Sequence, residues 1–200
     1  MTALADLKTR IADEIDRTDA TIQIASAITT ACSAYKFTRF AFNEHSDNLS
    51  TADGTIEYGT DEGLPTDILE VDSARITITS SNRYLLEQVP YRTIDELDTS
   101  GSYTSRPIWF SWHSEKLRLY PVPDGIYVIT LRYLASITEE TWCTRAEALI
   151  RCRAKRELYT HWLFDAQLAG TMLQAEALEL KALKREAMLK QASGRLVPHD

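Results

Sequence analysis

The chain has few of the residues from which metal, redox and phosphate sites are built. Its 200 residues include three cysteines, four histidines and seven glycines. Cys32, Cys143 and Cys152 lack the spacing of zinc ligands, so we expect reduced thiols with neither a structural disulfide nor bound zinc. No histidine pair has the four-residue spacing of a helical metal site, and glycine-rich phosphate loops and the G-x-S-x-G motif are missing. The sequence therefore predicts no catalytic, cofactor-binding or metal-binding residues.

Long apolar runs are also missing, which predicts no membrane span and no membrane partner. The formal net charge is -7, which argues against a general nucleic-acid binder. This charge fits an ordinary soluble protein, and equally the wall of a conduit to which DNA must not adhere. Among 29 acidic residues, a carboxylate pair for glycoside hydrolysis has no identifiable position. A cell-wall-cleaving enzyme is therefore the least favoured class.

The N-terminal part of the chain has a helical pattern. Residues 2–36 predict two helices, the first capped by Thr2 and the second ending near Tyr35. From residue 38 the apolar period changes to two, which is typical of strands. A turn signal at residues 52–54 predicts a hairpin between strands at 39–44 and 55–58.

The middle of the chain predicts further strands. Segments 68–72, 74–79 and 85–89 have strand patterns, and a short helix is expected over Tyr91–Leu97 with Thr93 as a possible cap.

Residues 106–134 predict three strands with a tight turn and a proline-rich corner between them. The last of the three has apolar residues on both faces, which favours a central position in the sheet.

The C-terminal part predicts one long helix over about residues 140–191, with a bend near Gly170. At 1.5 Å per residue it would span roughly 70 Å, so part of it should contact something other than its own core. We therefore expect an α+β fold, in which the N-terminal helices and the long C-terminal helix form a helical body with an inserted antiparallel β module. The helical body would comprise residues 1–37 and 140–191, the β module residues 38–139, and a C-terminal tail residues 192–200.

Three motifs carry a resemblance to a known family. They are residues 63–73 (GLPTDILEVDS), 106–109 (RPIW) and 117–125 (LRLYPVPDG). In this order and spacing they resemble the head-to-tail adaptor (connector) proteins of tailed bacteriophages, although Arg106 stands where the family has glycine. The motif positions are Leu64, Pro65, Pro107, Leu117, Leu119, Tyr120, Pro121, Pro123, Asp124 and Gly125.

The resemblance implies a structural, non-enzymatic protein made in the host cytoplasm and built into the neck of the virion. It implies a ring of identical copies, twelve expected, bound beneath the portal protein. The ring would extend the channel, let double-stranded DNA pass without specific binding, and offer a platform for tail or nozzle proteins. The alternative is another oligomeric neck, tail-side or head-completion protein that does not bind the portal.

Two groups of residues are candidates for contact with the portal or with a neighbouring subunit. The first is a basic cluster at the start of the long helical region; its alternative role is a solvated face paired with carboxylates of the sheet. The second comprises apolar positions late in the helix and in the tail, for which the alternative is a frayed end. The candidates are Arg145, Arg151, Arg153, Arg156, Leu180, Leu183, Leu189, Arg195, Leu196 and Val197.

Overall fold

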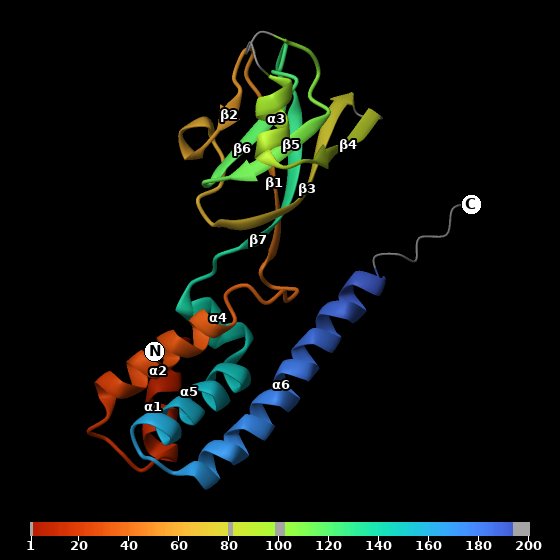
Figure 1. The fold of residues 1–200 in the computed structure, drawn as a ribbon. Helices are drawn as coiled ribbons and strands as arrows, with labels where there is room; N and C mark the ends of the chain where they lie inside the picture. The colour runs from red at the N-terminus through yellow and green to blue at the C-terminus, as the bar shows by residue number, and fades with distance from the viewer. Residues whose placement is uncertain (1, 80–81, 99–102, 194–200) are drawn as a thin grey trace. The chain divides into compact units, whose positions relative to one another are not determined.

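The structure is a computed structural model that describes residues 2–79, 82–98 and 103–193. It confirms the α+β class, with helices toward both ends of the chain and strands between them (Figure 1). The chain forms two compact units. The helical unit combines Met1–Phe42 with Ile137–Asp200, and the β unit is Asn43–Ser136.

The first two helices of the helical unit form as the sequence predicts. They are α1 (Ala3–Glu14) and α2 (Thr21–Ala34). The Thr2 hydroxyl caps α1 by accepting a hydrogen bond from the Ala5 amide. Glu140, far along the chain, accepts bonds from the next free amides, those of Ala3 (2.6 Å) and Leu4 (3.1 Å). The start of α1 is therefore fixed both by its own cap and by a later helix.

The prediction of one long C-terminal helix is wrong. Three helices occupy this region: α4 (Glu139–Arg145), α5 (Glu147–His161) and α6 (Ala166–Ser193). The chain reverses between α5 and α6, which then pack side by side (Figure 1). Phe164 takes a left-handed backbone conformation (φ 53°) at the reversal, and the Asp165 carboxylate accepts a bond from the Leu168 amide to cap α6. Gly170 lies inside α6 and is not the point of reversal.

An apolar core joins these helices. The ring of Trp142, on α4, stands edge-on to the rings of Phe40 and Phe42 in this core. Leu180 and Leu183 of α6 pack against the same core. The fully buried aliphatic members include Leu7, Ile11, Ile24, Ile28, Leu149 and Ile150.

The β unit is built on a seven-stranded, mostly antiparallel sheet with the order β1-β7-β3-β4-β5-β6-β2. The pairing of β4 with β5 is parallel. β7 lies between β1 and β3, which confirms the central position predicted for it. The strands are β1 (Glu44–Ser50), β2 (Glu57–Tyr58), β3 (Ile68–Thr79), β4 (Asn82–Gln88), β5 (Trp109–His113), β6 (Lys116–Tyr120) and β7 (Val128–Ala135), with the 3-10 turn η1 (Thr60–Glu62) and the helix α3 (Tyr91–Leu97).

Some local predictions in this unit are wrong. The strand predicted at residues 39–44 is wrong, because residues 41–43 form a turn and β1 begins at Glu44. The turn at residues 52–54 exists, but the strands on its two sides pair elsewhere, β1 with β7 and β2 with β6. Residues 68–72 and 74–79 form one continuous strand, β3. The helix α3 starts after Pro90, so Thr93 is not its cap. The hairpin error comes from pairing partners that are distant in the sequence.

Candidate assembly surfaces

The motif residues build the β unit rather than an exposed site. Seven of the ten have side chains buried in the unit: Leu64, Pro107, Leu117, Leu119, Tyr120, Pro121 and Pro123. The corner after β6 contains a cis peptide bond between Tyr120 and Pro121.

The turn at residues 52–54 holds this corner in place. The Gly54 amide donates to the Pro123 carbonyl (2.9 Å), and the Thr51 hydroxyl donates to the carbonyl of Gly125 (2.9 Å). The exposed Asp124 carboxylate accepts a hydrogen bond from the Tyr127 hydroxyl (2.6 Å). The sequence motif is therefore a folding motif.

The basic cluster lies on α5, where most of its charges are already paired inside the helical unit. Arg151 (3.1 Å) and Lys155 (2.9 Å) both contact Glu14 of α1. Arg153 contacts Glu157 one turn later (2.7 Å). These partners are carboxylates of α1 and of α5 itself, and not of the sheet. Arg145, at the end of α4, is exposed.

Glu176 of α6 is the central acid of this cluster, and sequence reasoning missed it. It is 7% exposed. Its carboxylate contacts Arg156 (3.0 Å) and Arg153 (3.6 Å), and accepts a hydrogen bond from the Tyr35 hydroxyl. Burial and the bond to Glu176 raise the pKa of Tyr35. One carboxylate thus joins α6 to both α5 and the end of α2.

The leucines predicted as contacts fall into two groups. Leu180 and Leu183 are half-buried against the core of the helical unit. Leu189 is 61% exposed and faces away from that core. Arg195, Leu196 and Val197 lie outside the described residues. Of the predicted leucines on the described part of α6, only Leu189 is exposed. The structure also shows an exposed leucine that was not predicted as a contact, Leu178 at 69%.

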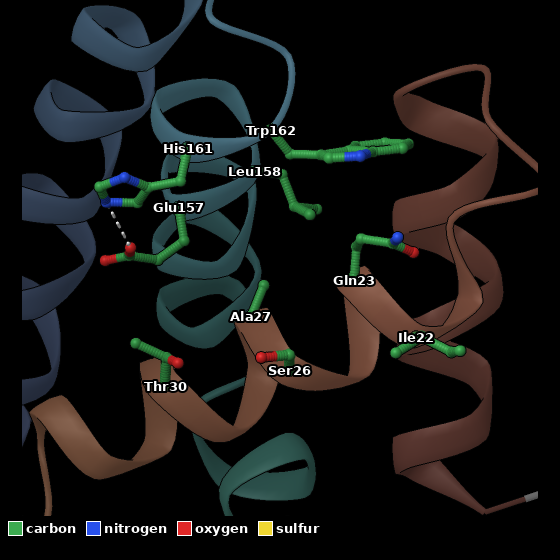
Figure 2. Close-up of a pocket in the computed structure, with 9 residues that line it drawn as sticks. All are labelled: Ile22, Gln23, Ser26, Ala27, Thr30, Glu157, Leu158, His161 and Trp162. Carbon is green, nitrogen blue, oxygen red and sulfur yellow. Dashed lines mark ion pairs between the residues drawn. The ribbon is translucent and has the colours of Figure 1, made fainter.

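A pocket of about 420 Å³ opens between α2 and α5. Figure 2 shows side chains from both helices around it, with Ile22 on α2 and Trp162 at the end of α5. The polar side is formed by Glu157 and His161, which are 3.3 Å apart. The Arg17 guanidinium stacks over the Trp162 ring at 4.6 Å. The pocket lies wholly within the helical unit and offers an apolar floor with a partly polar wall.

Within the described ranges, no group of three or more His, Cys, Asp or Glu side chains is placed to hold a metal ion. The same described residues contain no helix that is long and apolar enough to cross a membrane. The thiols of Cys32 and Cys143 are buried in the helical core. Burial raises the pKa of Cys32 to about 12 and that of Cys143 to about 11.

Because of these two thiols, alkaline pH should destabilise the helical unit. An unfolded thiol ionises near about pH 8.5, so the unfolded state loses protons before the folded state does. The stability that the two neutral, buried thiols contribute to the folded state is full below that pH and is lost as the pH rises toward 11 and 12. We expect the free energy of unfolding in urea to fall above about pH 9. The slope should be shallower in a Cys32→Ala, Cys143→Ala double variant; an unchanged slope would contradict the role of the thiols.

Comparison with known families assigns the chain. Residues 2–198 match the family described as SU10 adaptor protein. No curated protein matches the chain. The family match includes both the helical unit and the β unit.

Proposed function

Because the chain belongs to the SU10 adaptor protein family, a family of structural phage adaptors, we propose that it joins the head of a tailed bacteriophage to its tail. Identical copies, twelve expected, form a ring beneath the portal protein. The ring extends the DNA channel and carries the tail or nozzle proteins. The observation that carries this proposal is the match over residues 2–198, which includes the motifs of the β unit.

The charge of the chain supports a channel role. The net charge is -7, and most arginines of the basic cluster are neutralised by acids of the same unit. DNA phosphates would therefore find few free cations on this part of the surface, and duplex DNA could pass without being held. The protein would act in the virion neck after synthesis in the host cytoplasm.

Portal contact is proposed for the exposed members of the predicted set. Arg145 and Leu189 are exposed in the helical unit, and Arg195, Leu196 and Val197 follow α6 in the sequence. Arg153 and Arg156 serve instead to hold α6 through Glu176. An acidic or apolar groove on the portal would suit these residues.

The test is the mass of the purified chain by light scattering, alone and after mixing with the portal ring encoded by the same phage. We expect the 22.7 kDa chain to join the portal as a defined multiple. A chain that never binds the portal would contradict the proposal and favour another neck, tail-side or head-completion protein.

Removal of the tail tests the contact more narrowly. A chain that ends at Ala192 keeps the core contacts that the structure describes for α6, which extend to Leu183. We expect this truncation to unfold at the same urea concentration as the full chain and to lose portal binding. A second test variant, Leu196→Ser, Val197→Ser in the full chain, keeps the length of the tail and should also lose portal binding. Normal binding by both variants would remove the tail from the contact.

A further inference from the structure

The outer side of four neighbouring strands in the β unit is basic, although the chain as a whole is acidic. Along β7 the fully buried Ile129 and Leu131 alternate with outward residues such as the exposed Arg132. The Thr130 hydroxyl donates to the side-chain oxygen of Asn48 (2.8 Å), so the outward positions of β7 and β1 share one side. The pairing of β7 with β3, and of β3 with β4, extends this side across the sheet. We call this surface the arginine face; it is made by alternate residues of segments 46–50, 73–77, 83–85 and 128–132.

The arginine face holds the cations of the β unit that have no ionic partner. Arg75, Arg83 and Arg132 are exposed, and no ion pair among the described residues involves them. Acids outnumber bases in residues 43–136 by 15 to seven. The other four cations are each engaged by an acid or an aromatic ring of the same unit: Arg92, Arg106, Lys116 and Arg118. The positive charge of the face is therefore available to a partner.

The three arginines form a diagonal line across neighbouring strands. Arg132 on β7 is opposite Ser73, and Arg75 follows two residues further along β3. Arg75 is in turn opposite Leu85, and Arg83 lies two residues away on β4. Strands lie about 4.8 Å apart and two residues advance by about 6.6 Å, so successive arginines are roughly 8 Å apart and the line spans roughly 16 Å.

Two acids border the face without lying on this line. Glu44 precedes Ser46 on β1, and Glu87 follows Leu85 on β4. The Glu87 carboxylate accepts a hydrogen bond from the indole of Trp109 (3.1 Å). The positive surface is therefore the diagonal of arginines and not the whole sheet.

The remaining side chains of the arginine face favour phosphate over a protein surface. Protein interfaces have an apolar centre and are depleted in serine, whereas Leu85 and Val128 are the only apolar members of this face, all of which the structure describes. Hydroxyl and amide groups, which donate hydrogen bonds to phosphate, occupy the other positions. They belong to Ser46, Asn48, Ser50, Ser73, Thr77 and Thr130. No position of the face is aromatic, so unpaired bases would find no ring to stack on.

We infer that the arginine face contacts the phosphate backbone of duplex DNA without reading its sequence. Duplex DNA carries one negative charge per about 1.7 Å of its axis, so a line of cations of roughly 16 Å meets several phosphates. The inference rests on the proposed function for the choice of DNA as the polyanion, and it adds the surface that touches it. Three phosphate contacts are few, and the net charge of -7 opposes them. Each copy therefore binds weakly and releases quickly, which lets DNA slide past.

The measurement is an NMR titration of the ¹⁵N-labelled full chain with a duplex of about 20 base pairs at about 20 mM salt, where charges are weakly screened. We expect the amide signals of β7, β3 and β4 to shift. The dissociation constant should be weaker than about 10⁻⁴ M, because larger non-specific DNA surfaces reach that value at physiological salt. The logarithm of the binding constant should fall with the logarithm of salt concentration with a slope of about -2.7, or about 0.9 per phosphate.

Two triple variants separate the face from the overall charge. The test variant is Arg75→Gln, Arg83→Gln, Arg132→Gln, and we expect it to lose the shifts and the salt slope. The control removes three exposed cations elsewhere and changes the net charge equally: Arg92→Gln, Lys116→Gln, Lys184→Gln. The control should keep the slope of the wild type. All six positions are exposed, so both variants should fold, as circular dichroism would verify. Each single arginine substitution of the face should lower the slope by about 0.9.

Four results would overturn the inference: no shifts in the wild type, shifts confined to other elements, equal loss of binding in the two triple variants, or tighter binding of a single strand than of the duplex. Loss of binding to a portal or tail protein in the test variant, with no DNA contact in the wild type, would make the face a protein-binding surface instead.

Portal binding is measured separately, by light scattering with the portal ring. DNA contact through the arginine face in a chain that never binds the portal would contradict the proposed function alone. Portal binding by a chain whose amide signals ignore DNA would overturn this inference alone.

Discussion

Replacing Glu176 by alanine should lower the free energy of unfolding of the helical unit by about 3 kcal/mol. The change leaves Arg153 and Arg156 without their shared acid and the buried Tyr35 hydroxyl without its acceptor. Breaking a buried ion pair from one side costs about 3–5 kcal/mol, because the remaining charge stays desolvated. The arginine side chains are 22% and 19% exposed, so the lower end of that range applies.

The loss should be concentrated in α6. Urea unfolding gives the overall change, and hydrogen exchange should show faster exchange of the α6 amides than of α1 or α2 amides. Glu179→Ala is the control, because Glu179 is on the same helix and is only half-buried. Glu176→Gln should fall between the two, since an amide oxygen can still accept the bond from Tyr35. Equal losses from Glu176→Ala and Glu179→Ala would show that the cluster does not hold α6.

The Glu176 cluster also shows where sequence reasoning stops. In the sequence this acid stands in a charged, strongly helical stretch, where paired solvated charges are the usual reading. Its burial depends on Tyr35, which is 141 positions away, and on arginines of the preceding helix. The three- and four-residue spacing of apolar side chains predicts the buried face of α1. The same kind of spacing cannot show which distant groups surround one acid.

The reversal of the chain between α5 and α6 could not be predicted from the sequence for a related reason. Trp162, Leu163 and Phe164 continue the apolar pattern of α5, and no proline or glycine marks the break. Asp165 was the available signal, because aspartate is a preferred helix cap. The strands were easier to predict where local alternation decided them, as in β7. Pairing partners such as β1 with β7 join residues about 80 positions apart and leave no local trace.

In the β unit, Arg118→Ala should cost about 3–5 kcal/mol. The Arg118 side chain is 11% exposed and lies 3.5 Å from Asp98, whose side chain is 2% exposed. Its guanidinium also stacks over the Tyr91 ring at 4.8 Å and pairs with Asp95. Removing it leaves the Asp98 carboxylate buried beside α3 without this cation. Urea unfolding, followed by the fluorescence of Trp109 and Trp112 in β5, would report the change in this unit.

The matched control for Arg118 is Arg92→Ala, on the same short helix that carries Asp95. Arg92 is 89% exposed and pairs with Glu96 at 3.0 Å, so its loss should cost less than about 1 kcal/mol. Adding Asp98→Asn to Arg118→Ala should restore part of the stability, because the buried charge is then gone. A double variant as unstable as Arg118→Ala alone would mean that lost packing on Tyr91, and not the stranded carboxylate, sets the cost. Since the two units have separate cores, Arg118→Ala should also leave hydrogen exchange in α6 unchanged, whereas Glu176→Ala should leave exchange in β5 and β6 unchanged.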